Sequence, residues 1–293
     1  MMDNYFHNKC LICNSTYLES LEPYNHAHLV KCKSCKFVFS KKIPSKQELI
    51  DHYDGYGRND YLSPITIIRY NELLDKFEKF KKTKKILDVG CGIGYFLEIA
   101  SKRGWEVYGT EYTKDAINIC KSKGINVQEG KLNPQNYLVE EFDVITSFEV
   151  LEHINNPIEE ISNFYKILRK GGLVYLTTPN FNSVSRFYLK SDYNIITYPE
   201  HLSYYTTRTL KKLFRKINFK IYNLETTGIS ITRIKTSKGV SKQPFISEFS
   251  DDERIRRQIE KKPLLKITKK IINSMLTLFG IGNSLKGWFV KSS

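Results

Sequence analysis

Residues 86 to 94 read Ile86-Leu87-Asp88-Val89-Gly90-Cys91-Gly92-Ile93-Gly94, a short apolar run that leads directly into three alternating glycines. An apolar run of this length, bounded by a turn signal, is typical of a buried strand. Glycines at alternate positions allow the tight backbone turn that joins such a strand to a helix. The stretch therefore predicts a strand, a loop and a helix in succession.

The sequence around this loop alternates short apolar runs with amphipathic segments. The predicted strands are residues 85–89, 106–110, 125–127, 142–146 and 172–177, followed by 219–224 and 285–290. The predicted helices are residues 95–103, 113–123, 157–168 and 207–216. Single helices between strands predict an α/β fold with a parallel, doubly wound sheet, in which ligands bind at the carboxyl ends of the strands. Residues 228–262 are polar without a clear period, and we expect them to form a loosely ordered insertion.

The form of the glycine loop favours a ligand that has no phosphate. Gly90-x-Gly92-x-Gly94 lacks the third glycine at the spacing that dinucleotide-binding loops use. Asp88 would repel a phosphate but suits an ammonium group, and S-adenosylmethionine (SAM) carries both an ammonium and a sulfonium. Glu111 ends the next strand, where a carboxylate can accept hydrogen bonds from ribose hydroxyls. The residues predicted to bind SAM are Asp88, Gly90, Gly92, Gly94, Tyr95, Glu111, Tyr112 and Ser147.

Two cysteine pairs near the start of the chain predict a metal site. Cys10-x-x-Cys13 and Cys32-x-x-Cys35 have the spacing of two thiolate knuckles that close around one tetrahedral zinc ion. Disulfides and unpaired core cysteines are the alternatives, and matched pairs in a chain without secretion signals favour zinc. His26 and His28 lie between the pairs, and we expect them on the surface because four cysteines already complete the site.

The composition and charge of the chain bear on two questions, whether it binds nucleic acid and whether it is secreted or spans a membrane. The chain has 293 residues with a formal net charge of +15, which invites a nucleic-acid partner. The lysines are scattered, however, and no arginine-rich arm or RNA-stacking motif is present, so a solvated basic surface is favoured over a nucleic-acid groove. No run of eighteen apolar residues and no signal peptide are evident, which leads us to expect a cytoplasmic protein.

Residues 264–279 predict an amphipathic helix with lysines opposite its apolar positions. This helix has two interpretations. It could touch an anionic membrane surface, because residues 251–293 carry ten Lys or Arg against four Asp or Glu. We favour the alternative, a connection to the last strand whose apolar face lies on the core.

Several motifs in succession resemble class I SAM-dependent methyltransferases. They are residues 86–94, Glu111, the stretch from Phe142 to Ile154 and the stretch from Leu168 to Leu173. The resemblance covers about residues 84 to 225 and is nearest to small-molecule enzymes of the ubiquinone-biosynthesis type. Together with the cysteine ribbon and Pro199-Glu200-His201, the chain resembles zinc-ribbon methyltransferases of sugar and surface-polysaccharide pathways. This resemblance implies a seven-stranded Rossmann-like sheet whose last strand, at 285–290, is antiparallel, after an insertion at about 228–282.

Two of the six histidines follow predicted strands at the edge where ligands bind. These are His153 and His201, and histidine suits the removal of a proton from a hydroxyl nucleophile. The resemblance implies that Glu200 and His201 deprotonate the acceptor, with His153 as the second candidate base. Tyr53, Tyr56 and Tyr198 are predicted to bind the acceptor.

These observations predict three segments: a zinc ribbon at 1–45, a helical linker or lid at 46–83 and a SAM-binding domain at 84–293. The predicted function is methyl transfer from SAM to a small polar acceptor, above all O-methylation of a sugar or a surface-polysaccharide precursor. C-methylation or N-methylation of a small metabolite, methylation of RNA or protein, and a non-catalytic zinc-ribbon binding protein are the alternatives.

Overall fold

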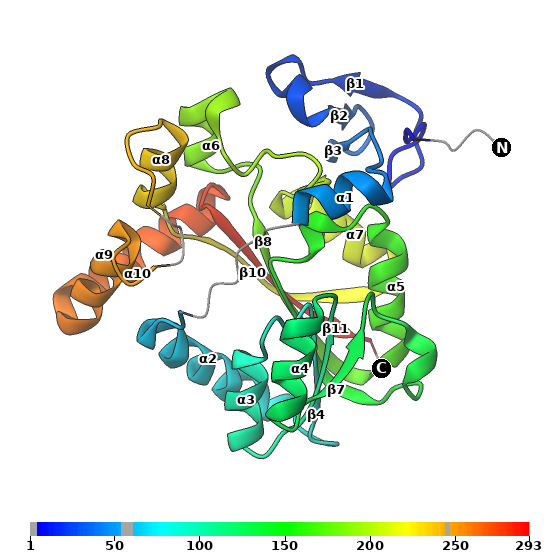
Figure 1. Ribbon diagram of the computed structural model, residues 1–293, viewed down its shortest axis with the longest axis vertical. Helices are drawn as coiled ribbons and strands as arrows, with labels where there is room; N and C mark the ends of the chain where they lie inside the picture. The colour runs from blue at the N-terminus through cyan, green and yellow to red at the C-terminus, as the bar shows by residue number, and fades with distance from the viewer. Residues whose placement is uncertain (1–4, 54–60, 244–246, 293) are drawn as a thin grey trace.

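The computed structural model describes residues 5–53, 61–243 and 247–292. A seven-stranded sheet forms its centre, with the strand order β10-β11-β8-β7-β4-β5-β6 (Figure 1). Its strands are β4 Lys85–Val89, β5 Glu106–Glu111, β6 Asn126–Glu129, β7 Phe142–Phe148, β8 Leu168–Pro179, β10 Phe219–Thr227 and β11 Ser284–Lys291. Strands β4 to β8 pair in parallel, whereas β11 runs antiparallel to both of its neighbours. The predicted α/β fold with an antiparallel last strand is confirmed.

Helices cover both faces of this sheet because its central strands are apolar on both sides. Neighbouring residues of β4 point to opposite faces: Ile86 packs with helices α2 and α3, whereas Leu87 packs with α5 and α7. The helices are α1 Lys46–Tyr53, α2 Pro64–Phe77, α3 Tyr95–Lys102, α4 Lys114–Ser122, α5 Pro157–Ile167, α6 Val184–Leu189, α7 Thr207–Lys216, α8 Ile231–Ser237, α9 Asp251–Lys261 and α10 Pro263–Phe279. Short 3₁₀ helices are η1 Glu22–Ala27, η2 Glu78–Phe80, η3 Pro134–Asn136, η4 Leu151–His153 and η5 Lys190–Asp192.

A second, smaller sheet contains the N-terminal strands. Its order is β1-β2-β3-β9, where β1 is Leu18–Ser20, β2 is Leu29–Cys32, β3 is Val38–Ser40 and β9 is Ser203–Tyr204. The fourth strand comes from far along the chain and pairs antiparallel with β3. Side chains of the cysteine ribbon share one buried cluster with α7 and the central sheet. The ribbon is therefore joined to the main body by both backbone pairing and core packing.

The polar stretch after β10 is better ordered than its composition predicts. The expectation of a loosely ordered insertion at 228–262 is wrong where helices α8 and α9 form. Both helices begin at serine caps, Ser230 and Ser250, and Asp252 of α9 accepts hydrogen bonds from the first backbone N–H groups of α8. Caps and polar bonds of this kind stabilise a helix that has no apolar stripe. The hydrophobic period of the sequence therefore does not predict α8 and α9.

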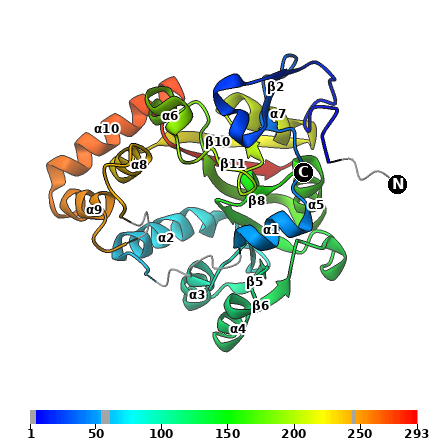
Figure 2. The same ribbon diagram turned by 45° about the horizontal axis from the view of Figure 1, so that its top comes forward.

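Helix α10 connects to β11 as predicted, but its apolar face is not on the core. Its one buried residue is Leu276, whereas Leu264, Ile271 and Leu278 are 73%, 57% and 80% exposed. Helices α8, α9 and α10 lie together at one side of the molecule, away from the ribbon strands (Figures 1 and 2). The favoured core-facing interpretation is therefore wrong, because α10 meets the body along a narrow edge beside β10 and α9. Within the described residues, no helix has both the length and the apolar character that crossing a bilayer requires.

Candidate functional site

The glycine loop lies between β4 and α3, where a helix N-terminus meets the sheet edge. Gly90, Gly92 and Gly94 have φ values of 74°, 53° and 77°, a region that favours glycine. A Cβ at Gly90 would lie 2.5 Å from Val150 Cγ2, and one at Gly94 would lie 2.5 Å from Ile125 Cδ1. At Gly92, in contrast, no described atom beyond its two chain neighbours lies within 4 Å of an added Cβ. Packing requires two of the glycines, and the third leaves the backbone open to a ligand.

Asp88 is a buried carboxylate at the end of β4. Its exposed fraction is 2%, and the hydroxyl of Thr146 donates to its Oδ1 at 2.7 Å. Burial, opposed by the Thr146 bond and assisted by the charge of Glu111, raises the pKa of this carboxyl to about 7. A cationic partner such as an ammonium group would stabilise the ionised form of a carboxyl that is buried in this way.

Glu111 ends β5 and holds the glycine loop from the other side. Its Oε2 accepts a hydrogen bond from the Gly92 backbone N–H at 2.9 Å. Its Oε1 accepts bonds from the backbone N–H groups of Tyr112 and Thr113 and from the Thr113 hydroxyl, at 2.8, 3.0 and 2.9 Å. The carboxylate predicted to bind ribose is thus turned toward its own loop.

The other predicted SAM residues lie near the same edge in different settings. Tyr112 follows Glu111 and is 67% exposed, and Tyr95 opens α3 with the Lys123 ammonium 4.6 Å from its ring centroid. Ser147 is buried near the carboxyl end of β7. The exposed ring of Tyr112 next to the loop is available to stack on a planar ligand, whereas Tyr95 is half-buried and Ser147 offers only a buried hydroxyl.

The segment after β7 joins the glycine loop to the predicted acceptor side. Gly90 backs onto Val150, which stands between Glu149 and the short helix η4. Glu149 has a φ of 53°, and its backbone N–H donates to the Thr177 carbonyl at 2.9 Å. Loss of solvent around the Glu149 carboxyl raises its pKa, although the residue as a whole is exposed.

His153 and His201 are brought together although 47 residues separate them in the chain. Their ring centroids lie 4.8 Å apart in an edge-to-face arrangement. His153 Nδ1 lies 2.8 Å from the Glu200 carbonyl, and His201 Nδ1 lies 2.6 Å from the Ile195 carbonyl. Because a carbonyl oxygen only accepts, each Nδ1 carries the proton and each Nε2 keeps its lone pair.

The environment of both imidazoles disfavours their charged forms. Burial, and then the neighbouring His153, lowers the pKa of His201 to about 4, while the charge of Glu200 raises it. Burial also lowers the pKa of His153. Both rings are therefore neutral near pH 7. Each can accept a hydrogen bond, or bind a metal ion as a ligand, through Nε2.

The structure places the remaining predicted acceptor residues unevenly. The Glu200 carboxylate accepts a bond from the Thr197 hydroxyl at 3.3 Å and lies 3.8 Å from His52 Nε2 of α1. It acts on His201 through its charge, and the Ile195 carbonyl orients that ring. Tyr198 faces the ribbon side: its hydroxyl donates to Glu48 at 3.3 Å, and its ring packs edge-to-face on His28 at 4.9 Å. Tyr56 and the side chain of Tyr53 lie outside the described residues.

Sequence reasoning missed two residues of this region. Glu152 is 3% exposed and accepts a bond from the Thr178 hydroxyl at 2.9 Å, and burial and the charge of Glu149 raise the pKa of its carboxyl well above the ordinary value. His52 faces Glu200 from the linker helix. The signal for Glu152 was present in Glu149-x-x-Glu152-His153, whereas His52 is placed only by the packing of α1.

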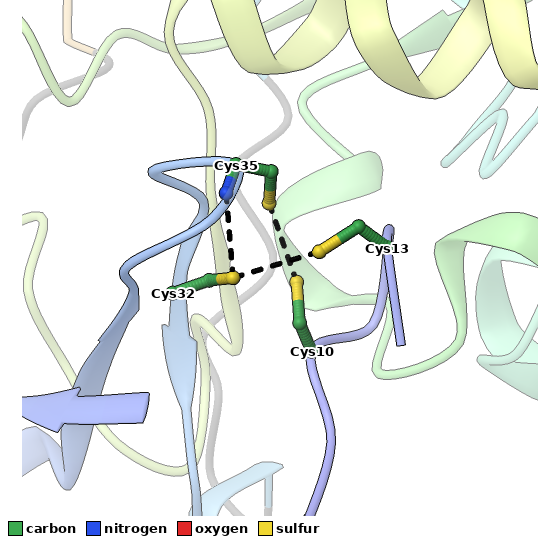
Figure 3. Close-up of side chains that lie close together, drawn as sticks. All are labelled: Cys10, Cys13, Cys32 and Cys35. Atoms are coloured by element: carbon green, nitrogen blue, oxygen red, sulfur yellow. Dashed lines mark hydrogen bonds between the residues drawn. The ribbon is translucent and has the colours of Figure 1, made fainter. Parts of the chain in front are cut away.

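The four predicted zinc ligands converge as the spacing predicts (Figure 3). Cys10 Sγ lies 3.4 Å from Cys35 Sγ, and Cys13 Sγ lies 3.5 Å from Cys32 Sγ, with all four sulfurs within 4.8 Å of one another. Tetrahedral zinc with four thiolates places its sulfurs about 3.8 Å apart. The Cys35 backbone N–H points at Cys32 Sγ at 3.5 Å, as expected for a turn that supports a thiolate ligand. The residues present therefore fit a zinc ion, and His26 and His28 are exposed as predicted.

Comparison with known proteins agrees with this geometry. The model of a protein family described as a methyltransferase domain matches residues 66–224. The ubiquinone biosynthesis O-methyltransferase of Aliivibrio fischeri is 31% identical over 142 residues, which cover 44% of this chain and 58% of that protein. The enzyme of the same name from Haemophilus ducreyi is 33% identical over 149 residues, covering 46% and 63%. The matches thus span less than two thirds of these relatives.

Solved structures support the fold. A SAM-dependent methyltransferase from Archaeoglobus fulgidus superimposes with a TM-score of 0.52 at 17% identity, covering 83% of this chain and 99% of that one. A sarcosine dimethylglycine methyltransferase (its function marked as provisional) from Galdieria sulphuraria gives a TM-score of 0.53 at 14% identity, covering 84% and 99%. The family match over more than half of the chain, the sheet order and the glycine loop lead to one conclusion: the chain belongs to the class I SAM-dependent methyltransferases.

Proposed function

We propose that this protein transfers the methyl group of SAM to a hydroxyl group of a small polar acceptor, a sugar or a precursor of a surface polysaccharide. One observation carries the proposal. The glycine loop packs through Gly90 against Val150, and the segment that holds Val150 continues into His153, which contacts His201. A SAM site and a pair of neutral imidazoles thus share one edge of the sheet.

On the SAM side, the chain supplies a carboxylate for each polar end of the ligand. Asp88 would balance the ammonium group, which removes the penalty that burial imposes on its charge. Glu111 would bind the ribose hydroxyls in place of donors that it now takes from its own loop, such as the Thr113 hydroxyl. Gly92, Tyr95 and Tyr112 would line the adenosyl group. SAM supplies a methyl group on a sulfonium, which is a good leaving group, so alignment provides much of the rate.

On the acceptor side, the imidazole pair is suited to a hydroxyl. His201 is neutral with its Nε2 lone pair available, so it can accept a hydrogen bond from the hydroxyl and then its proton. The low pKa of His201 makes it a weak base alone, and the charge of Glu200 raises that pKa. His153 is the second candidate. The relatives described above are named as O-methyltransferases, which agrees with a hydroxyl acceptor. Methyl transfer to carbon or nitrogen would use the same edge.

The cysteine ribbon has a structural role in this proposal. Its four thiolates hold zinc, and its strand β3 pairs with β9, which follows His201 by two residues. We keep the proposed cytoplasmic location, because a reducing environment preserves thiolates that can bind zinc. We keep the division into a ribbon at 1–45, a lid at 46–83 and a SAM-binding domain at 84–293, with His52 of the lid facing Glu200.

A second function, contact with a membrane surface, is favoured by the exposure of α10. Its apolar residues form a solvent-facing stripe at helical spacing: Leu264, Ile267, Ile271, Met275 and Leu278. Lysines lie on the opposite side of the helix, and residues 251–293 carry a net charge of +6. An exposed apolar stripe on a basic helix is suited to an anionic bilayer surface.

The SAM site is tested by a matched glycine pair. Gly92→Ala and Gly124→Ala each place a methyl group at positive φ in open space, so each should cost about 1 kcal/mol of stability. Calorimetry with S-adenosylhomocysteine should show binding to the unmodified protein and to Gly124→Ala, and at least tenfold weaker binding to Gly92→Ala. Absence of binding to the unmodified protein at millimolar ligand would contradict the proposal.

The acceptor is tested by mass spectrometry of products from a panel of nucleotide-sugars and phenolic hydroxyl compounds. His201→Ala should lower turnover by about 100-fold or more while S-adenosylhomocysteine binds as before. His7→Ala, a histidine of the ribbon, serves as the control. Near-normal turnover in His201→Ala would exclude the proposed role, and a methylated phenol without a methylated sugar would exclude the sugar.

A further inference from the structure

A cluster of metal-binding side chains lies at the acceptor edge, apart from the four cysteines. It consists of Glu152, His153 and His201, whose ligand atoms lie within 4.8 Å of one another. Two of these residues belong to η4 after β7, and the third lies in the loop before β9. Two imidazoles and one carboxylate are the donor set of zinc and other first-row divalent ions in sites that keep open coordination positions.

Both histidines are already oriented as metal ligands are. A histidine that binds a metal through one nitrogen usually donates its other N–H to a carbonyl or carboxylate, which fixes the ring and its tautomer. His153 and His201 each make this bond to a backbone carbonyl, at 2.8 and 2.6 Å. Each ring is thus held with the lone pair of Nε2 available, and the fixing bonds come from the backbone, so they do not depend on a neighbouring side chain.

Glu152 is a buried carboxyl that lies among other acidic side chains. It is 3% exposed, and the Thr178 hydroxyl donates to its Oε2. Within the described residues, no Lys, Arg or His nitrogen lies within the 4.0 Å of an ion pair with Glu152. Burial and the charges of Glu149 and Glu200 raise the pKa of Glu152, and the Glu149 side chain is a hydrogen-bond partner of Glu152. Arg233 is a cation that faces Glu149 and Glu200. A bound cation would stabilise the ionised form of a carboxyl in this setting.

The spacing of the three residues leaves room for an ion. The carboxylate is beyond 4.0 Å from both imidazoles, yet all ligand atoms are within 4.8 Å. An ion bound at about 2.1 Å from each ligand atom would hold them roughly 3 to 4 Å apart. Binding of a cation would therefore require the ligand atoms to move somewhat closer together than they are in this structure.

We propose that Glu152, His153 and His201 bind one divalent first-row cation, with open coordination positions directed to the acceptor. The role of this ion rests on the proposed function. A hydroxyl bound to the ion would lose its proton more readily: the electron pair of the O–H bond stays on oxygen, and the proton passes to Glu200 or to water. With the ion bound, Nε2 of His201 is occupied, so the ion takes over the activation of the hydroxyl. The site itself requires neither SAM nor acceptor.

Manganese binding tests the site independently of catalysis. Mn²⁺ binds thiolate sites weakly relative to zinc, so protein with zinc in the cysteine site can be titrated with Mn²⁺ and followed by loss of the free-ion electron paramagnetic resonance signal. We expect one Mn²⁺ per chain, and at least about tenfold weaker binding in Glu152→Gln and in His201→Ala. Glu160→Gln, another buried glutamate outside the cluster, should bind Mn²⁺ as the unmodified protein does.

The variants are first checked with S-adenosylhomocysteine, which should bind them unchanged if they are folded. Glu152→Gln keeps the size of the side chain and its bond to Thr178, and His201→Ala provides the second measurement if the first variant does not fold. The proposal is overturned if neither Mn²⁺ nor a second equivalent of zinc binds the unmodified protein, or if both variants bind Mn²⁺ as tightly as Glu160→Gln. Binding without methyl transfer would contradict the proposed function and leave the ion site standing.

Discussion

At the scale of single residues, Asp88 combines a cost in stability with a proposed role in binding. Its folded-state pKa of about 7 lies above the ordinary value of 3.8 because the carboxylate is buried. A group whose pKa is raised on folding stabilises the protein below its unfolded pKa and loses that contribution as the pH rises through the folded pKa. The ligand-free protein should therefore lose stability between about pH 4 and above pH 7.

Asp88→Asn should reverse this loss, since the amide keeps the bond to Thr146 without a charge. At pH 8 we expect the variant to be more stable by roughly 2–4 kcal/mol in thermal or urea unfolding, with the difference shrinking toward pH 4. Its affinity for S-adenosylhomocysteine should fall at least tenfold because the ammonium loses its partner. Asp115→Asn, at an exposed carboxylate on α4, is the control. Equal stability of Asp88→Asn and the unmodified protein at pH 8 would contradict the argument.

At the scale of elements, α10 shows how a helix can match an amphipathic pattern and still face solvent. The side of the helix that carries Leu276 meets β10, where the Thr226 hydroxyl donates to the Leu276 carbonyl at 2.7 Å. The stripe that contains Ile271 and Leu278 points away from this contact. The helix is therefore anchored at its C-terminal end by polar bonds and leaves its apolar residues without a partner in the described part of the chain.

Ile271→Ser combined with Leu278→Ser tests the membrane proposal. Each apolar side chain that enters an interface contributes on the order of 1–2 kcal/mol, so the double variant should bind phosphatidylglycerol vesicles at least tenfold more weakly in a sedimentation assay. Val240→Ser, an equally exposed apolar site outside α10, should bind as the unmodified protein does. Weak binding to phosphatidylcholine vesicles would support the role of charge. A dimer in solution that the double variant dissociates, without vesicle binding, would assign the stripe to a second copy instead.

At the scale of the whole molecule, the ribbon supports the loop that carries His201. The Ser40 backbone N–H donates to the Leu202 carbonyl at 2.8 Å, and the Leu202 N–H donates to the Glu152 carbonyl at 2.8 Å. His26 of the ribbon lies 3.1 Å from the Ile196 carbonyl in the same loop. The loop is thus held between the ribbon and the segment after β7, and the four-cysteine ribbon is coupled to the acceptor edge through backbone bonds.

Loss of zinc should therefore affect the acceptor edge more than the SAM site. Metal analysis of the unmodified protein should show one zinc per chain bound by cysteines, and less than about half an equivalent would count against the ribbon. In Cys13→Ser/Cys32→Ser we expect hydrogen exchange to lose protection at β3 and β9 while β4 stays protected. Turnover should fall at least tenfold with S-adenosylhomocysteine affinity retained. Equal loss of protection in β4 would mean that the ribbon supports the entire fold.

The sequence alone determined the features that depend on local chemistry. A run of buried apolar residues followed by Gly90, Gly92 and Gly94 specifies a strand and its turn, because few other residues adopt the positive φ values found there. Two Cys-x-x-Cys pairs specify a thiolate cluster because each turn supplies two ligands. The alternation of strands and helices specifies the sheet, since parallel strands require crossover helices.

The tertiary structure alone decided what depends on contacts between distant segments. It places His201 against His153 and brings the overlooked Glu152 beside both, because β9 pairs with the ribbon and draws the preceding loop over η4. It also leaves the stripe of α10 in solvent, because an amphipathic pattern states that a face is apolar but not what covers it. Local periodicity carries no information on which segments meet, and that information arises only when the chain packs as a whole.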